Sequence, residues 1–420
     1  MHETPNIVED VTSLACGGLC DDLRVEVVAG RATPAGDACP VARDWFAAPH
    51  PGDGHPPATI DGRPVGLDEA IARAAEILGG ARSPLIRGLT GTTVETMREA
   101  LAIADAIGAA VDLGGSRSSD HRRSAFQRVG KVSATLGEVR DRADLVVFWH
   151  CDPIGTHARL WDRCVEASGE FIPGGRSGRT VIAIGTAPTA TSARADLSLI
   201  VSPECRGDLL RILRGLVRGK ALDPSRVERA VGWPFAAIRD LADRLLGARY
   251  GVFFAGGEVA DAAEAEAVLT LVRDLNEGRR FVLMDPGGPG NASGVGAVAT
   301  WQAGAPTALD FARGYPRYLP GEATLRARRD AIDALLVVAP APPAIDLPGL
   351  PTILIGPGAT RPDLPRTSVA IDVARPGIES GGTISRPDGV MLPLRPPLAP
   401  GPRPTDRDVL RAIGDRVRKS

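Results

Sequence analysis

The chain has 420 residues, a length that at roughly 150 residues per domain predicts about three domains. Its 49 Lys and Arg residues nearly balance 51 Asp and Glu, and 24% of residues are charged while 44% are hydrophobic, which indicates a globular chain and excludes a disordered one or a basic nucleic-acid-binding protein. The balanced charge leads us to expect no nucleic-acid partner. No apolar run approaches the roughly 20 residues of a membrane helix, and the first residues lack the basic and apolar regions of a secretory signal, so we expect no membrane association.

The first segment predicts a small β-rich domain over residues 1–60. Hydrophobic and polar residues alternate through Leu23–Val28, which is the pattern of a half-buried strand. Proline, glycine and polar residues then fill His50–Pro57, a composition typical of a linker. We therefore place the first domain boundary near residue 60.

Residues 61–204 predict an α/β domain. Asp68 is the expected cap of a helix, and Thr92 and Thr93 precede a second one. The apolar faces of these two helices are expected to be Ile71, Ala74, Ala75 and Leu78 in the first, and Val94, Met97, Leu101 and Ala104 in the second. Short apolar strands are expected at 83–88, 145–149 and 180–184. Such strands separated by amphipathic helices indicate βαβ units and a parallel sheet covered on both faces.

The same alternation continues to the end of the chain. Residues 205–345 predict a second α/β domain, and 346–420 predict strands and a helix that complete the α/β core. The expected helices are 206–217, 236–246, 262–275 and one from Thr405 onward, and the expected strands are 251–255, 281–285, 334–339, 352–355 and 369–372. The predicted fold class is therefore α/β, with two doubly wound, Rossmann-like parallel-sheet units and a small N-terminal β-rich domain.

Three cysteines gather near the N-terminus. Cys16 and Cys20 are separated by three residues, and Cys39 follows nineteen residues later. Four-iron clusters are held by runs of the type Cys-x2-Cys-x3-Cys with a distant fourth cysteine, but Ser13 stands where the first cysteine would be. The cysteines can therefore be small buried apolar residues, cluster ligands or zinc ligands. Six cysteines in the whole chain are too few for a disulfide scaffold, so we expect a reducing, cytoplasmic compartment.

Two loops follow predicted strands, where open α/β sheets bind ligands. The first holds Asp152, His157 and Arg159, which could contact a charged or heterocyclic molecule; a lone histidine can equally be a hydrogen-bonded structural residue. The second, from Gly287 to Gly296, includes Gly290 and Asn291. Its glycines would let the backbone approach a phosphate closely, although a plain tight loop explains them equally well.

Two of only three tyrosines fall in one short run. Phe311–Glu322 contains Arg313, Tyr315, Arg317 and Tyr318. In a chain with 4% aromatic residues, this run indicates a rigid loop that caps a site or contacts a partner, or a loop that packs on itself.

Taken together, these segments resemble the B subunit of formylmethanofuran dehydrogenase, a member of the molybdopterin oxidoreductase superfamily. The resemblance covers nearly the whole chain and is most specific in the aromatic run. It is carried by the segments Ser13–Cys39, Leu136–Pro153, Thr300–Pro306, Phe311–Glu322 and Gly382–Asp388. It implies that the family reduces carbon dioxide at a tungsten or molybdenum pterin centre, which a four-iron cluster supplies with electrons, and that residues 1–60 are a degenerate iron–sulfur domain.

The chain departs from this family at the redox centres. The first cluster cysteine is replaced by Ser13, and the family's metal-ligating cysteine falls on Arg117–Arg122, where Ser118 is the nearest match. A hydroxyl is a poor substitute for a soft thiolate ligand. We therefore expect no cofactor in this chain: neither the pterin metal nor the iron–sulfur cluster. The degenerate cofactor cleft would then comprise Ser118, Asp120, His121, Asp152, His157, Arg159, Gly290 and Asn291, and the degenerate cluster positions would be Ser13, Cys16, Cys20 and Cys39.

These departures make the chain resemble the bacterial relative, the B subunit of the formyltransferase/hydrolase complex of methylotrophs. That resemblance implies a non-catalytic structural subunit in a cytoplasmic complex with subunits A, C and D, one of which carries zinc and releases formate. Two alternatives stay open. One is an active dehydrogenase whose metal is held by Ser118 or Asp120. The other is a carrier-binding subunit that uses Arg122, His157 and Arg159 on a methanofuran-type carrier, because arginine binds carboxylates well. Contact with the carrier or a partner is expected at Arg122, Arg159, Arg313, Tyr315, Arg317 and Tyr318.

Overall fold

The computed structural model describes residues 6–18, 20–36, 38–114, 117–257, 259, 261–339, 347–399 and 401–419. The chain forms two compact units. Unit 1 comprises residues 1–114, 288–386 and 391–420, and unit 2 comprises 115–287 and 387–390.

Unit 1 is built on a nine-stranded sheet whose five central strands are parallel. Those five lie in the order β7 (Ala110–Asp112), β6 (Pro84–Gly88), β15 (Ala334–Val338), β16 (Thr352–Ile355) and β17 (Val369–Ile371). Two short hairpins extend the edges in antiparallel fashion: β13 (Leu309–Asp310) with β14 (Arg317–Tyr318), and β4 (Ala58–Ile60) with β5 (Arg63–Pro64).

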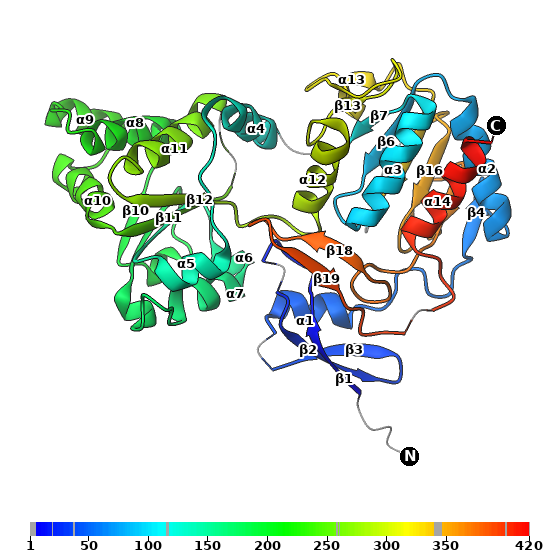
Figure 1. Cartoon of the computed structure of the whole chain (residues 1–420), viewed down its shortest axis with the longest axis horizontal. Helices are drawn as coiled ribbons and strands as arrows, with labels where there is room; N and C mark the ends of the chain where they lie inside the picture. The colour runs from blue at the N-terminus through cyan, green and yellow to red at the C-terminus, as the bar shows by residue number, and fades with distance from the viewer. Residues whose placement is uncertain are drawn as a thin grey trace. The chain divides into compact units, whose positions relative to one another are not determined.

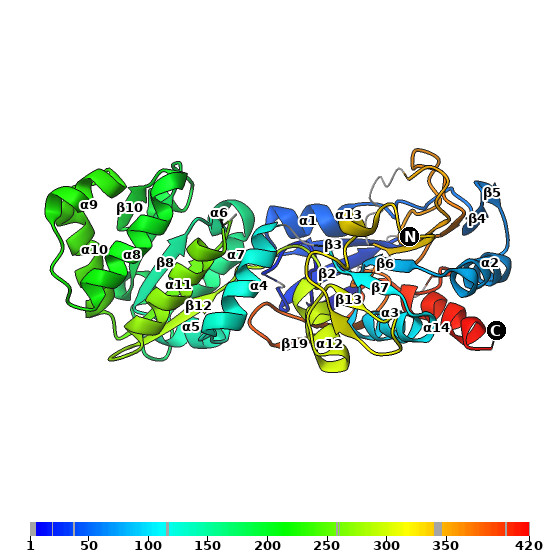
Figure 2. The ribbon, with the colours of Figure 1, turned by 90° about the horizontal axis from the view of Figure 1, so that it is seen from above.

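Helices cover one face of this sheet and enclose its main core. They are α2 (Leu67–Gly80), α3 (Val94–Ile107), α12 (Ala292–Ala303) and α14 (Asp406–Val417). Figure 2 shows α3 and α14 side by side next to β6 and β7. The predicted apolar faces of α2 and α3 are all buried in this core. The opposite face packs against loop residues and the short helix α13 (Leu325–Arg328).

One predicted helix start is wrong in detail. Asp68 does not cap α2, because the chain enters the helix earlier and Gly66 is the residue before it. The Asp68 carboxylate instead accepts a hydrogen bond from Arg416 of α14 at 2.8 Å. Thr93, by contrast, caps α3 through a hydrogen bond that its hydroxyl accepts from the Thr96 N–H.

The N-terminal residues form the predicted β-rich element. β1 (Asn6–Val11), β2 (Leu23–Val28) and β3 (Arg31–Ala35) make an antiparallel sheet, and α1 (Pro40–Ala47) packs against it. A separate small core joins these elements, and Ile378 from a distant part of unit 1 contributes to it. A hairpin of β18 (Gly382–Ser385) and β19 (Met391–Leu394) completes the strands near the C-terminus.

Unit 2 is a five-stranded parallel sheet. The strand order is β10 (Leu197–Ile200), β9 (Thr180–Gly185), β8 (Leu145–Trp149), β11 (Tyr250–Ala255) and β12 (Arg280–Met284). Of the five strands of this sheet, β8 comes first in the sequence and lies in the centre. Later strands are added on both sides of it. The place where the winding reverses lies between β8 and β11, and it is there that such sheets bind ligands.

Both faces of the unit 2 sheet are covered. One face packs against α4 (Arg117–Val129), α8 (Arg206–Val217), α10 (Phe235–Gly247) and α11 (Ala262–Leu275), while α9 (Pro224–Val231) packs on α8 and α10. The other face packs against α5 (Leu136–Arg142), α7 (Ala158–Trp161) and the π-helix at Asp162–Glu166 that directly follows α7. The short α6 (Pro153–Thr156) precedes α7. Figure 1 shows α8 and α11 on one side of β10–β12 and α5 and α7 on the other.

The predicted α/β class with two doubly wound sheets is confirmed, but the units do not follow the predicted boundaries at residues 60, 204 and 345. The predicted domain 61–204 contributes strands to both sheets. The reason is strand pairing over long sequence distances: β6 pairs with β15, so residues after 330 belong to the same sheet as residues before 90.

Candidate functional site

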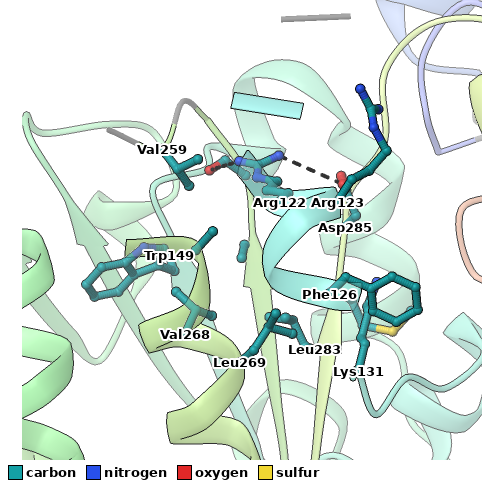
Figure 3. Close-up of a pocket in the computed structure, with 14 residues that line it drawn as sticks. Arg122, Arg123, Phe126, Lys131, Trp149, Val259, Val268, Leu269, Leu283 and Asp285 are labelled. Carbon is teal, nitrogen blue, oxygen red and sulfur yellow. Dashed lines mark hydrogen bonds and ion pairs between the residues drawn. The ribbon is translucent and has the colours of Figure 1, made fainter. Parts of the chain in front are cut away.

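A pocket opens at the carboxyl end of the unit 2 sheet. Its volume is about 330 Å³. Trp149 at the end of β8, Ala255 of β11 and Leu283 of β12 line it, together with Val268 and Leu269 of α11. Arg122, Arg123 and Phe126 from α4, with Lys131 and Asp285, also line it (Figure 3). The pocket is therefore apolar inside, with charged groups among its lining residues.

Arg122 is held against the ends of two strands. Its Nη2 donates to the carbonyl oxygen of Gly256 at 3.0 Å and also to that of Gly257. Its Nη1 lies 3.9 Å from the carboxylate of Asp285. Because both carbonyls follow β11 and Asp285 follows β12, the guanidinium spans the carboxyl ends of neighbouring strands.

The residues after β8 are not poised for nucleophilic chemistry. Burial lowers the pKa of His150 to about 4, and the charge of Arg206 adds to this effect. Burial raises the pKa of Cys151 to about 12, with the charge of Asp285 adding to it, and the thiol donates to the Phe254 carbonyl at 3.2 Å. At neutral pH the histidine is therefore uncharged and the cysteine is a protonated, unreactive thiol.

Asp152, His157 and Arg159 occupy the predicted loop. One carboxylate oxygen of Asp152 accepts hydrogen bonds from the Thr191 N–H at 3.0 Å and hydroxyl at 2.5 Å, so Asp152 ties this loop to the turn after β9. The Nδ1 atom of His157 lies 2.8 Å from the Thr156 hydroxyl, and burial lowers the pKa of His157. Arg159 lies in α7. The loop is at the predicted edge of the sheet, and Asp152 fixes its shape.

Helix α4 carries the predicted residues around the family's metal ligand. Asp120 forms an ion pair with Arg123, one turn away. His121 follows, and its buried Nδ1 has no hydrogen-bond partner in the described ranges. Ser118 lies in the first turn of α4, and its side chain falls outside the described part of the structure.

Gly290 and Asn291 lie in unit 1 and are fixed by their neighbours. A Cβ on Gly290 would lie 2.5 Å from the Thr90 carbonyl oxygen, so only glycine fits there. The buried Asn291 amide donates to the Thr92 carbonyl and accepts from the Ser385 N–H, both at 2.8 Å. Asn291 therefore has a structural role, because its amide joins its own loop to the segments around Thr92 and Ser385.

The aromatic run divides into an inner and an outer part. Arg317 donates to the buried Asp310 at 3.0 Å, and Arg328 binds the same carboxylate. Burial alone would raise the pKa of Asp310, but these hydrogen bonds outweigh it and lower the pKa. Tyr318 packs against the unit 1 core, whereas Arg313 is exposed and Tyr315 is 53% exposed. The outer residues are therefore the most exposed of the run, while Arg317 and Tyr318 are partly buried.

The N-terminal donor set does not fit a four-thiolate cluster. Ser13 is buried, its hydroxyl accepts from the Ala15 N–H at 3.2 Å, and its own N–H donates to the Cys20 carbonyl at 2.9 Å. Cys20 packs in the small N-terminal core, and Cys39 lies at its margin. No three His, Cys, Asp or Glu side chains among the described residues are grouped so that they could hold a metal ion.

Lys131 and Asp285 are site residues that the sequence analysis did not single out. The signal available for Lys131 was its rarity, because only three of the 49 basic residues are lysine. Asp285 is the last residue of the predicted strand 281–285, a polar residue at the end of an apolar run, which was a weaker signal. Within the described ranges, no helix has the length and apolar character needed to cross a lipid bilayer.

Comparisons with known proteins agree in sequence and in fold, although no protein-family model matches the chain. It is 31% identical to the B subunit of the tungsten-containing formylmethanofuran dehydrogenase 2 of Methanocaldococcus jannaschii, over 98% of this chain and 99% of the relative. It is 26% identical to the B subunit of the formyltransferase/hydrolase complex Fhc of Methylorubrum extorquens, over 86% of this chain and 97% of the relative.

Similar folds are also found among solved structures. The X-ray structure of the Methylorubrum extorquens formyltransferase/hydrolase complex with methylofuran contains a chain that matches with a TM-score of 0.73 and 26% identity, over 86% of this chain and 99% of that one. Acetylene hydratase from Pelobacter acetylenicus matches with a TM-score of 0.65 and 10% identity, over 98% of this chain and 69% of that one, which shows the fold alone. The molybdopterin-oxidoreductase-like fold is thus confirmed, and the chain belongs to the family of formylmethanofuran dehydrogenase B subunits.

Proposed function

We propose that this chain is the non-catalytic B subunit of a cytoplasmic formyltransferase/hydrolase complex, which converts formyl-tetrahydromethanopterin to formate through a methanofuran-type carrier. The observation that carries the proposal is the serine at two family thiolate positions, Ser13 and Ser118. One position belongs to the path that delivers electrons and the other to the metal that receives them. The loss of either thiolate would impair redox catalysis. Once one is lost, the other no longer serves that function, so the loss of both fits a chain without redox activity.

The chemistry of the two side chains supports this proposal. A thiolate is a soft, electron-donating ligand that forms at accessible pH, whereas a serine hydroxyl stays protonated at neutral pH and is a hard donor. The hydroxyl of Ser13 is also already used, because it accepts a hydrogen bond from the Ala15 N–H. The N-terminal sheet can therefore persist as a structural element without a cluster.

The proposal assigns the chemistry to partners. Subunits A, C and D would carry formyl transfer and zinc-dependent hydrolysis, and the present chain would hold them together. Trp301 on α12 and Tyr315 in the aromatic run are 64% and 53% exposed. Large exposed aromatic side chains of this kind are typical of protein interfaces, so we assign them to contact with other subunits.

A second candidate is a redox-active dehydrogenase subunit. It is favoured by the 31% identity to a tungsten-containing relative over 98% of this chain, and by the three cysteines Cys16, Cys20 and Cys39. In this alternative, Ser118 or Asp120 would supply an oxygen ligand to the metal.

Alanine substitution of Ser118 distinguishes the two candidates. Full-length Ser118→Ala would be purified with its co-expressed partner subunits, beside Ser124→Ala as a control on the same helix. Formate release and carbon dioxide reduction with a low-potential electron donor would both be assayed. We expect formate release from the formylated carrier to be unchanged and carbon dioxide reduction to be absent in every variant. Carbon dioxide reduction by the unsubstituted complex, lost in Ser118→Ala and kept in Ser124→Ala, would contradict the proposal.

A further inference from the structure

Helix α12 presents an exposed face without charged residues. None of its residues carries a charge, although 24% of the residues in the whole chain do. One side of the helix is buried in the unit 1 core. The other side is exposed and includes Ser293, Thr300, Trp301 and Gln302. A helix side that faces water normally carries charged groups, so this face is typical of a surface that another protein covers.

Trp301 is the largest side chain of this exposed face. It is 64% exposed, so most of its indole ring lies outside the unit 1 core. Tryptophan is one of the residues that contribute most to binding energy in protein interfaces, because its large flat ring buries much apolar area at a small cost in conformational entropy. Trp301 is therefore the expected anchor of a contact at this face.

A groove adjoins the uncharged face of α12. Its volume is about 340 Å³, and Gln302, the residue after Trp301, lines it. The other lining residues come from α3 and α14, and they are Glu95, Arg98, Glu99, Ala102, Arg407 and Arg411. Figure 1 shows α3 between α12 and α14, and α3 packs against both. The groove is therefore continuous with the uncharged face through Gln302.

Both carboxylates of the groove already have partners. Glu95 accepts hydrogen bonds from the Thr383 N–H at 3.0 Å and from the Thr383 hydroxyl at 2.8 Å. Glu99 accepts a hydrogen bond from Arg411 at 2.8 Å. Because three arginines line the groove against these two glutamates, the lining carries a net positive charge.

Arg98 and Arg407 have no carboxylate partner in the described part of the chain. Both residues are exposed, and neither guanidinium forms a hydrogen bond or an ion pair among the described residues. A guanidinium binds a carboxylate through two parallel hydrogen bonds, so the groove suits a ligand that carries carboxylates. A protein segment fits better than a free small acid, because the groove is continuous with the face that exposes Trp301.

We propose that the uncharged face of α12 and the adjoining groove form one docking surface for an acidic segment of another subunit of the complex. Apolar residues of that segment pack against Trp301, and its Asp or Glu side chains pair with Arg98 and Arg407. This inference rests on the function proposed above, because that function supplies the partner subunits.

The first test reverses the charge of the groove. The full-length chain with Arg98→Glu and Arg407→Glu would be co-expressed with subunits A, C and D, and the strength of association would be measured at low and high ionic strength. We expect association to weaken at least about tenfold, and the difference from the unsubstituted chain to shrink at high ionic strength. The matched Arg326→Glu, at an exposed arginine of α13 outside the groove, should leave association unchanged.

The second test identifies the occupant. The photoreactive residue p-benzoylphenylalanine would replace Trp301 in the assembled complex, and mass spectrometry would map the cross-linked peptide. We expect one segment of another subunit in which apolar residues stand beside at least two Asp or Glu residues. Lysine in place of those acidic residues should restore association with the chain that carries Arg98→Glu and Arg407→Glu.

The outcomes separate this inference from the proposed function. If the unsubstituted chain assembles with none of the three subunits, the proposed function fails and the inference fails with it. If the complex assembles, the inference alone is overturned by charge reversal that weakens association no more than Arg326→Glu does. It is also overturned by a cross-link only to a second copy of this chain or to a segment without acidic residues. Saturable micromolar binding of free glutarate at Arg98 and Arg407 would instead mark the groove as a small-molecule site.

Discussion

Asp406 illustrates how one buried residue makes stability depend on pH. It lies in the first turn of α14 and is 5% exposed. Its carboxylate accepts hydrogen bonds from the Thr96 hydroxyl at 2.9 Å and the Arg407 N–H at 2.8 Å. Burial nevertheless dominates and raises the pKa of Asp406 from 3.8 to about 6. The folded state therefore binds this proton more tightly than the unfolded state does.

The raised pKa predicts the effect of Asp406→Asn. Below about pH 4 the carboxyl is protonated in both states and costs nothing, and as the pH rises from about 4 through about 6 the folded state progressively loses up to roughly 3 kcal/mol. Asparagine keeps an acceptor but cannot ionise. The free energy of unfolding of the variant, relative to the unsubstituted chain, should therefore rise between about pH 4 and pH 7 by up to that amount.

Urea unfolding at several pH values checks this prediction. Asp415→Asn is the matched control, because Asp415 lies on the same helix and its side chain is 56% exposed in an ion pair with Arg418. That control should show no comparable pH-dependent gain. Parallel pH profiles for Asp406→Asn and the unsubstituted chain would show that Asp406 titrates normally.

Asn291 and Ser118 mark what sequence reasoning can and cannot do for single residues. A glycine-rich loop after a strand is compatible with phosphate binding, and nothing local in the sequence indicates that the Asn291 amide bonds to Thr92 and Ser385. That Ser13 and Ser118 stand at thiolate positions of the family is a prediction from the resemblance, and it needs only the residue types in the sequence. The sequence therefore supports hypotheses that depend on residue type, whereas contacts between distant segments could not be predicted from it.

At the scale of elements, helices and strands with a regular apolar pattern could be predicted from the sequence, whereas short irregular elements could not. The strands β8, β11 and β16 and the helices α8 and α11 lie where their apolar patterns predicted them. The two-residue strands β13 and β14 are too short to carry a periodic pattern, and they form only because they pair next to β7. The π-helix at Asp162–Glu166 likewise has no periodic signature.

The end of β6 shows why pairing over a long sequence distance places a strict demand on one residue. Gly88 has a φ of +93°, and a Cβ there would lie 2.3 Å from the Val338 carbonyl oxygen of β15. That carbonyl accepts a hydrogen bond from Leu89 at 2.6 Å. A side chain at position 88 would therefore force the two central strands of unit 1 apart.

We predict that Gly88→Ala destabilises the chain by about 3 kcal/mol or more, because it combines backbone strain with overpacking. The control is Gly79→Ala near the end of α2, where a Cβ meets nothing within 4 Å. Alanine there should stabilise the helix by up to about 1 kcal/mol. Chemical denaturation of both variants measures the difference, and equal midpoints for the two would contradict the structural account of β6 and β15.

At the scale of the whole molecule, the chain leaves unit 1 after residue 114 and returns to it at residue 288. Composition and linker signals identify boundaries only where a domain is continuous in sequence, so the predicted domains could not reproduce this arrangement. The fold class was nevertheless predictable, because the alternation of helices and strands does not depend on which strands pair.

The functional account also belongs to the whole molecule. Family membership establishes kinship with a dehydrogenase-type or formyltransferase/hydrolase complex, and the proposal of a structural role rests on the two serines. In the proposed role the chain supplies a rigid α/β scaffold and exposed aromatic contacts, and the partner subunits carry the reaction.

Metal and pterin analysis of the complex purified with all its subunits tests this account most directly. Tungsten, molybdenum, iron and zinc would be measured per copy of this chain by mass spectrometry after anaerobic purification, and pterin would be extracted and quantified in parallel. We predict that tungsten, molybdenum, iron and extractable molybdopterin are far below one equivalent, while zinc in a partner subunit is close to stoichiometric. One equivalent of tungsten or molybdenum with pterin, or several equivalents of iron in this chain, would contradict the account.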